Sequence, residues 1–245
     1  MSKPPRALIV FSKPAVPGRV KTRMLTALTP RQAADLHLAC LRDTLSAAAR
    51  LQHLKKTLCV AADASSARTL ASQLRLGKSW RVRIQRGRDL GARMGSAIRE
   101  ELSRGARHVV IIGTDTPWLD ARRIAAAFRA LEQADVVLGP ARDGGYYLVG
   151  ARRVVPEMFR AIAWGTDKVL SETLARLQAT RTSCFLLEED FDLDVPDDLT
   201  RAAQLLQAGA RAPHLRRWLT KWRAAQSSRR PAPRRRRKTR RPARA

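Results

Sequence analysis

The sequence predicts an α/β fold in which a mostly parallel β-sheet is covered by helices. Short apolar runs rich in Val, Ile and Leu alternate with longer amphipathic segments, and Gly or Pro residues follow several of the runs. The chain has 245 residues, of which 44% are hydrophobic, which is enough to bury one substantial core. We therefore expect a single folded domain built from alternating strands and helices.

The first half of the chain carries the clearest alternation. The apolar run at 7–11 predicts a buried strand, because it is short and Pro14 follows it. Thr29 and Pro30 then suit the start of a helix that extends to about Arg50. The same reasoning predicts strands at 57–62, 81–85, 108–113 and 135–140, and helices at 64–76, 90–103 and 120–133.

The rhythm changes after Pro140. Gly144 and Gly145 predict a tight turn before the apolar segment 146–150. Only short helical stretches follow, then a strand at 184–190 and a helix at 196–207. Such a change is typical of transferases in which a nucleotide-binding half precedes an acceptor half.

Positive charge is concentrated at the C-terminus. The formal net charge is +27, and residues 211–245 contain 13 Arg and 2 Lys but no acid. The rest of the chain keeps 33 of the 48 basic residues against 21 acidic ones, a net charge of +12, which suits an anionic substrate. We expect one folded domain over 1–210 and a basic, largely disordered tail over 211–245.

The tail suggests two kinds of contact. A run of arginines binds RNA, DNA or anionic lipid without sequence specificity. Residues 214–223 have the pattern of a basic amphipathic helix, in which Trp218 and Trp222 lie on a membrane surface or pack back onto the core.

Cysteine and histidine usage favours a cytoplasmic protein without a His-based zinc site. The cysteines number three, which is odd, and none is in a C-x-x-C motif: Cys40, Cys59 and Cys184. We therefore expect reduced thiols. The four histidines have no metal-ligand spacing. No stretch approaches the roughly 20 apolar residues of a membrane span.

The segment 11–23 forms a basic, glycine-containing loop after the first strand. Gly18 allows close approach of the backbone to a ligand, while four cations add charge. A solvated basic loop is the alternative, but the position after the first strand of an α/β sheet favours a diphosphate-binding role. The predicted phosphate-binding residues are Lys13, Gly18, Arg19, Lys21 and Arg23.

A second glycine-flanked turn lies at 86–94. Asp89 suits the N-cap of the helix that begins at Leu90. Arg88 and Arg93 bracket the same turn and are able to pair with phosphate or ribose, so we consider both a capping and a nucleotide-binding role for this segment.

Asp115 lies two positions after the apolar run at 108–113, and Pro117 turns the chain after it. Asp120 is better placed to cap the next helix. Asp115 is therefore predicted as a metal ligand and catalytic residue, because carboxylate oxygens at the carboxyl end of a strand suit Mg²⁺ bound to a diphosphate.

The predicted acceptor pocket comes from two later segments. A hairpin turn by itself explains Asp143 before Gly144 and Gly145, but two glycines also leave room for a sugar, and Tyr146 is able to stack or hydrogen-bond. Trp164 and Thr166 precede a helix and are candidates for the pocket wall and a helix cap.

Asp192 and Asp194 occupy alternate positions of an extended segment, so their side chains share one face. Asp197 and Asp198 already provide negative charge at the start of the following helix. We therefore predict Asp194 as a second metal ligand and Asp192, with Asp143, as a candidate for activating an acceptor hydroxyl.

Six motifs in order carry a resemblance to a known family: KPxxPGxxKTR, DLGxRM, GTDTPxL, GPxxDGGYYLxG, WGT and DxDxPxDL, spread between residues 13 and 199. The sequence resembles the GT-A-like bacterial transferases that include proposed arsenosugar-biosynthesis glycosyltransferases. It is more distantly similar to phospholactate guanylyltransferases and molybdenum-cofactor nucleotidyltransferases, but it lacks their LAGGxGxRxG loop. The resemblance implies a three-layer GT-A (nucleotide-diphospho-sugar transferase) fold and a metal site at Asp115 and Asp194.

These inferences predict a transferase that uses Mg²⁺ or Mn²⁺ and a nucleotide-activated small molecule. The first hypothesis is glycosyl transfer from a nucleotide-diphospho-sugar to a small acceptor. The alternative is nucleotidyl transfer from an NTP to a phosphorylated small molecule, with release of pyrophosphate. A third hypothesis, nucleic-acid binding, rests on the Arg-rich tail alone.

Overall fold

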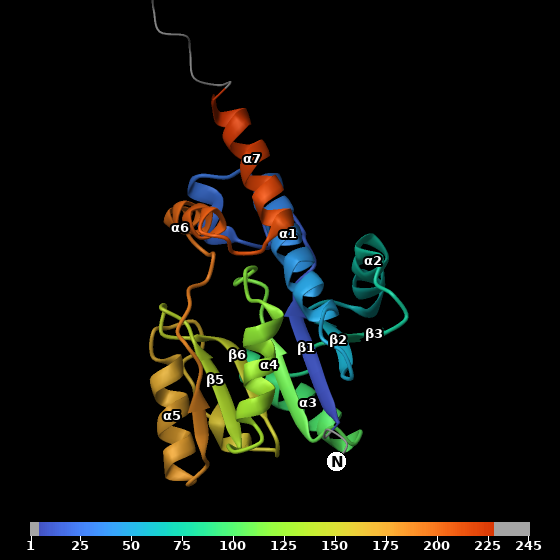
Figure 1. Cartoon of the computed structure of the whole chain (residues 1–245), viewed down its shortest axis with the longest axis vertical. Coiled ribbons are helices and arrows are strands. Elements are labelled where there is room, and N and C mark those ends of the chain that lie inside the picture. The colour runs from blue at the N-terminus through green and yellow to red at the C-terminus, as the bar shows by residue number, and fades with distance from the viewer. Residues whose placement is uncertain (1–4, 228–245) are drawn as a thin grey trace, which may run out of the picture.

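The computed structural model describes residues 5–227 and has a seven-stranded sheet with α-helices on both faces (Figure 1). The strands are β1 (Arg6–Ser12), β2 (Lys55–Val60), β3 (Trp80–Ile84), β4 (His108–Ile112), β5 (Val136–Pro140), β6 (Tyr146–Ala151) and β7 (Cys184–Leu186). The α-helices are α1 (Pro30–Ala49), α2 (Ala64–Leu74), α3 (Leu90–Ser103), α4 (Ala121–Ala130), α5 (Val169–Ala179), α6 (Pro196–Gln207) and α7 (Pro213–Ser227). Two short 3₁₀ helices, η1 (Thr22–Thr26) and η2 (Pro156–Phe159), complete the described elements.

The sheet has the order β3-β2-β1-β4-β6-β5-β7. All neighbouring strands are parallel except at β6, which runs antiparallel to both β4 and β5. The predicted α/β fold with a mostly parallel, helix-covered sheet is therefore confirmed. The chain first extends the sheet from β1 to β3 and then returns to place β4 on the other side of β1. This reversal creates a crevice at the carboxyl ends of β1 and β4, where open α/β sheets bind ligands.

The two faces of the sheet are covered by different helices, because successive side chains of a strand point to opposite faces. Leu8 and Val10 of β1 pack on one face with residues of α1, α2 and α4. Ala7 and Ile9 pack on the other face with residues of α3 and α5. The result is the expected three-layer arrangement of helices, sheet and helices.

A third apolar cluster joins η1, α1, α6 and α7. Asp43 of α1 accepts hydrogen bonds from the backbone N–H groups of His214 (3.0 Å) and Leu215 (2.8 Å), so its carboxylate caps the first turn of α7. Trp218 and Trp222 stack with ring centroids 5.8 Å apart and pack against this cluster. Figure 1 shows α7 alongside α1.

The helical pattern of residues 214–223 is present as α7, within the segment 211–245 in which we expect the basic tail. Pro213–Ser227 is helical because Leu215 and Leu219 are buried and because Asp43 accepts hydrogen bonds from backbone N–H groups of the first turn. The expected disorder of the Arg-rich run 229–245 falls outside the described residues. Among residues 5–227, no helix combines the length and the apolar character needed to cross a membrane.

Candidate functional site

A cavity of about 730 Å³ opens at the carboxyl ends of β1 and β4, at the reversal of strand order. Residues from segments far apart in the sequence line it: the loop after β1, the end of β4, the β5–β6 hairpin, the turn before α5 and the segment before α6. Most of the predicted site residues are brought together here: Lys13, Arg19, Lys21, Arg23, Arg93, Asp115, Asp143, Gly145, Tyr146, Trp164, Thr166, Asp192 and Asp194.

Gly18, Arg88, Asp89 and Gly144, by contrast, are not among the residues that line this cavity. Asp89 caps α3 by accepting a hydrogen bond from the backbone N–H of Ala92 at 2.7 Å. Arg88 pairs with Asp89 at 3.3 Å, and both line a separate cavity of about 380 Å³ against α3 and Trp164. The capping role considered for Asp89 is present in the structure, whereas its nucleotide-binding role stays a prediction.

Lys21 lies at the centre of the charged part of the cavity. Its ammonium donates to a carboxylate oxygen of Asp115, to the backbone carbonyl of Leu193 and, at 3.2 Å, to a carboxylate oxygen of Asp194. The Lys21 side chain is 2% exposed, whereas those of Asp115 and Asp194 are 41% and 34% exposed. The two predicted metal ligands therefore meet around one cation, and each keeps a face towards solvent.

The electrostatics of this group follow from burial and from the shared charge. Burial lowers the pKa of Lys21, but the nearby charges, led by Asp115, outweigh burial and raise it above its ordinary value. Burial disfavours ionisation of Asp115, yet the charge and hydrogen bond of Lys21 reverse this effect and lower its pKa. For Asp194, burial prevails over Lys21, and its pKa is raised.

Asp192 lies beside the same group. Its carboxylate accepts a hydrogen bond from the Thr116 hydroxyl at 2.9 Å. Burial, reinforced by the negative charge of Asp115, raises the pKa of Asp192 to about 7. A carboxylate with such a pKa is suited to accept a proton near neutral pH.

The basic loop after β1 presents its remaining cations to the solvent-filled part of the cavity. Lys13, Arg19 and Arg23 are exposed. Within the described residues, none of the three has an acidic partner at ion-pair distance. They are therefore available to an anionic ligand, whereas Lys21 already contacts two carboxylates.

The glycines of the β5–β6 hairpin are required mainly by the close packing of the turn. Gly144 has φ +83°, and a Cβ atom there would lie 2.1 Å from the backbone oxygen of Asp167. Asp143 accepts a hydrogen bond from the backbone N–H of Gly145 at 2.9 Å, which stabilises the turn. Gly144 thus lets the turn before α5 approach the hairpin, rather than itself facing the cavity.

The structure also adds two cavity residues that sequence reasoning missed. His37 of α1 is buried and its Nε2 lies 3.0 Å from the carbonyl oxygen of Lys13, and burial lowers its pKa. Gln85 donates to the carbonyl oxygens of Ser12 (3.2 Å) and Cys59 (3.1 Å). Neither belongs to a local motif, because each acts on a backbone group distant in the sequence.

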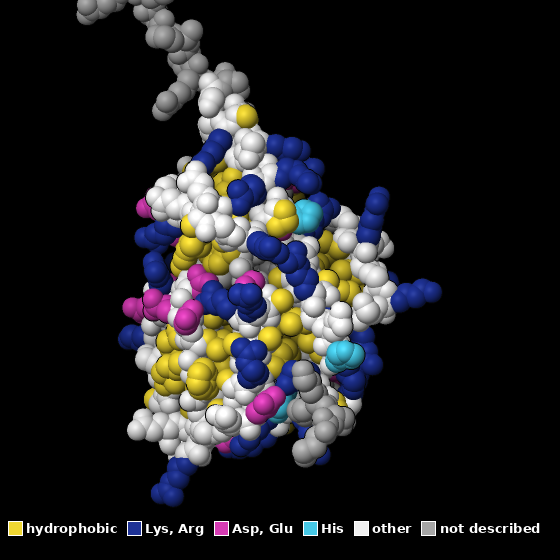
Figure 2. All heavy atoms as spheres, in the orientation of Figure 1, with side chains coloured by type: hydrophobic (Ala, Val, Ile, Leu, Met, Phe, Trp, Pro, Cys, Tyr) yellow, Lys and Arg dark blue, Asp and Glu magenta, His cyan; other side chains and the backbone are white. Residues whose placement is uncertain are grey.

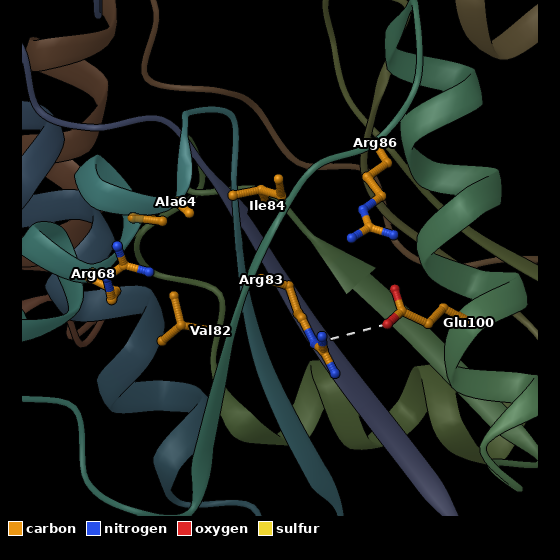
Figure 3. Close-up of a pocket in the computed structure, with 8 residues that line it drawn as sticks. Ala64, Arg68, Val82, Arg83, Ile84, Arg86 and Glu100 are labelled. Atoms are coloured by element: carbon orange, nitrogen blue, oxygen red, sulfur yellow. Dashed lines mark ion pairs between the residues drawn. The ribbon is translucent and has the colours of Figure 1, made fainter.

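A smaller cavity of about 240 Å³ lies next to the edge strand β3 (Figure 3). Arg83 pairs with Glu100 of α3 at 3.8 Å, and Arg86 extends towards the same carboxylate. None of the predicted site residues lines this cavity. Figure 2 shows Lys and Arg side chains spread widely over the visible face of the molecule, in keeping with the basic charge calculated for the body of the chain.

The residues around Lys21 also have the chemistry that a divalent cation requires. Among the described residues, no group of three or more His, Cys, Asp and Glu side chains gathers as a metal site. Two carboxylates and the carbonyl of Leu193 nevertheless surround one cationic group, and this oxygen-only donor set fits Mg²⁺ or Mn²⁺.

The fold is α/β and resembles that of nucleotide-diphospho-sugar transferases. The chain belongs to the family described as "Uncharacterized protein conserved in bacteria (DUF2064)", which matches residues 44–166. No curated protein matches the chain.

Solved structures share its fold. A "putative nucleotide-diphospho-sugar transferase" from Desulfovibrio desulfuricans G20 has 29% identity and a TM-score of 0.82, over 90% of this chain and 95% of that one. The 4-diphosphocytidyl-2C-methyl-D-erythritol synthase of Anaerococcus prevotii has 11% identity and a TM-score of 0.55, over 83% and 96%. The inositol-1-phosphate CTP transferase of T. maritima has 12% identity and a TM-score of 0.51, over 84% and 97%. The latter two similarities concern the fold alone.

Proposed function

We propose that this protein is a glycosyltransferase that moves a glycosyl group from a nucleotide-diphospho-sugar to a small acceptor with the help of Mg²⁺ or Mn²⁺. One observation carries the proposal: two acidic segments, 115 and 192–194, meet a basic loop in one cavity at the reversal of strand order. The similarity to the Desulfovibrio desulfuricans protein and the six-motif resemblance support the same class of reaction.

In this proposal the cations of the loop after β1 hold the donor. Arg19 and Arg23 bind the diphosphate through their guanidinium groups, and Lys13 adds a third positive charge. Asp115 and Asp194 would hold the metal ion, which supplies positive charge that stabilises the departing diphosphate. The donor is thereby oriented with its sugar towards the β5–β6 hairpin and Trp164.

Transfer also requires a base for the acceptor. The bond between the sugar carbon and the diphosphate oxygen breaks, and a bond from the acceptor oxygen to that carbon forms. The acceptor proton passes to a carboxylate, for which Asp192 and Asp143 are the candidates. Tyr146, Trp164 and Thr166 form the acceptor side of the cavity.

A thermal-shift series tests this proposal. The purified protein is melted with UDP-, GDP-, ADP- and dTDP-sugars and with NTPs, each with and without Mg²⁺. A sugar nucleotide is expected to raise the melting temperature more in the presence of Mg²⁺, because ligand binding to the native state stabilises it. Asp115→Asn should remove the Mg²⁺-dependent part of the shift, whereas Asp197→Asn, an exposed acid that does not line the cavity, should retain it. An unchanged shift in Asp115→Asn contradicts the metal assignment.

Nucleotidyl transfer is the second candidate, because the same carboxylates and loop cations would also suit an NTP. The two reactions differ in the released product: nucleoside diphosphate for glycosyl transfer, pyrophosphate for nucleotidyl transfer. Stabilisation by NTPs alone, with pyrophosphate release, would support the second candidate. A nucleic-acid role through the C-terminal arginines is tested by removing residues 228–245, which on our proposal leaves transferase activity intact.

A further inference from the structure

Lys21 differs from the other cations of its loop because its side chain is buried, whereas theirs are exposed. Its side chain is 2% exposed and its ammonium contacts Asp115, Asp194 and the carbonyl of Leu193. Lys13, on the same loop, is exposed and has no acidic partner among the described residues. A lysine that is almost fully buried between two carboxylates is unusual, because lysine normally keeps its ammonium in water.

The backbone of Lys21 is fixed in an uncommon conformation. Its φ of 48° and ψ of 40° are left-handed, which is rare for a residue other than glycine and is found at functional sites. Its carbonyl accepts a hydrogen bond from the backbone N–H of Met24 at 2.9 Å, and Met24 is fully buried. The backbone is therefore anchored, so that a displacement of the ammonium would be confined to the lysine side chain.

Asp115 and Asp194 need a positive charge between them, since two carboxylates this close repel each other. Lys21 supplies one charge at that point. A divalent cation bound by the same oxygens would be repelled by an ammonium that stayed in contact with them. At these oxygens the ammonium and a divalent cation therefore disfavour each other's binding.

We propose that Lys21 and the divalent cation compete for Asp115 and Asp194, so that cation binding displaces the Lys21 ammonium into the cavity towards the donor diphosphate. The inference rests on the proposed function in taking these two acids as the metal ligands and a diphosphate as the group that the donor presents. It assigns Lys21 two positions: with the acids before the cation binds, and with the diphosphate afterwards. Lys21 is then a positioning residue for the acids and a ligand-binding residue for the donor.

Mn²⁺ binding without any nucleotide tests the competition, with electron paramagnetic resonance to count the free ion. Removal of the competing charge in Lys21→Met should tighten Mn²⁺ binding about tenfold or more. Lys13→Met is the matched control, because Lys13 lines the same cavity but forms no ion pair with either acid among the described residues; it should change the affinity less than about threefold. Adding Asp115→Asn to Lys21→Met should abolish the tight binding.

Several results would overturn the proposal. One is an affinity of Lys21→Met for Mn²⁺ that is equal to or weaker than that of the wild type. Another is a gain in Mn²⁺ affinity in Lys13→Met as large as that in Lys21→Met. The third is the absence of saturable Mn²⁺ binding in the wild type, Lys21→Met and Lys13→Met alike. If Lys21→Met does not fold, NMR of the lysine Cε–Hε signals in the wild type replaces it, with Lys21 assigned from Lys21→Arg. The Lys21 signal should then shift saturably with Mg²⁺, and a signal that stays unchanged would overturn the competition. Because no donor is present, a protein that passes these tests but binds no sugar nucleotide would contradict the proposed function alone.

Discussion

The hydroxyl of Thr116 donates a hydrogen bond to Asp192 at 2.9 Å and thereby joins two acidic segments that are 76 positions apart in the sequence. A backbone hydrogen bond from the N–H of Leu193 to the carbonyl of Asp115, 2.8 Å long, strengthens the same junction. The segment before α6 is thus fixed to the end of β4, and the alternate positions of Asp192 and Asp194 bring both carboxylates to the cavity.

Thr116→Val should destabilise the protein by about 1–3 kcal/mol, because it leaves the partly buried Asp192 carboxylate without its hydroxyl donor. Urea unfolding followed by fluorescence measures the change. Thr220→Val, at an exposed position of α7, is the control and should change the free energy of unfolding by less than about 0.5 kcal/mol. Equal stability of Thr116→Val and the wild type would contradict the importance of this junction.

Paired substitutions distinguish the two candidate bases, Asp192 and Asp143. Asp192→Asn should lower turnover by about 10²–10⁴-fold while the donor-induced melting shift persists, because a base acts on the acceptor and not on donor affinity. Asp143→Asn should have a smaller effect, since Asp143 accepts a hydrogen bond within its own turn. Turnover with the donor identified in the thermal-shift series is the readout. The opposite order of effects would transfer the role to Asp143.

Acid stability should depend on Asp135. Its hydrogen bonds to Arg153 and Arg152 lower its pKa to about 2. A carboxylate with a lowered pKa stabilises the folded state above its unfolded pKa of about 4 and loses this contribution as the pH falls towards 2. Asp135→Asn should therefore cost about 1–2 kcal/mol near pH 7, and the difference from wild type should shrink between about pH 4 and pH 2.

The comparison for Asp135 is Glu189→Gln. Glu189 is exposed and pairs with exposed Arg142 at 3.6 Å, so we expect little effect at any pH. Chemical denaturation at several pH values gives both curves. A difference between Asp135→Asn and wild type that stays constant from pH 7 to pH 2 would show that ionisation of Asp135 is not its cause.

Asp43 should be essential for the attachment of α7. Asp43→Ala removes the acceptor of two N–H groups in the first turn of α7, and we expect a loss of about 1–2 kcal/mol. The fluorescence of Trp218 and Trp222 reports the detachment, because both pack between α7 and its neighbours. Asp35→Ala on the same helix, which removes an exposed ion pair with Arg31, should leave the fluorescence unchanged. Unaltered fluorescence in Asp43→Ala would contradict the capping role.

Much of the fold follows from local sequence patterns. Strands β1 to β5 and helices α1 to α4 begin and end within a few residues of their predicted positions, because each has a continuous apolar run or an amphipathic face with a clear start signal. For helix α5 the sequence indicates only the start, with Thr166 as a candidate cap. Its start lacks a capping side chain, and Thr166 instead bonds to the backbone of Ala163 and Lys168.

The candidate site was predictable in its residues but not in all of its contacts. The position of Asp115 after a strand indicates the crevice, since strand ends of a parallel sheet share one edge. The burial of Lys21 was not predictable, because it depends on acids 94 and 173 positions away. The close packing of Gly144 on Asp167 likewise depends on a tertiary contact that the double glycine does not specify.

The most direct measurement is a crystal structure of the protein with Mn²⁺ and a nucleotide-diphospho-sugar that stabilises it, with the metal located by its anomalous scattering. Our account predicts one strong anomalous peak within coordination distance of Asp115 and Asp194, with the diphosphate against Arg19 and Arg23. A peak elsewhere, or a nucleotide bound outside this cavity, would contradict the account.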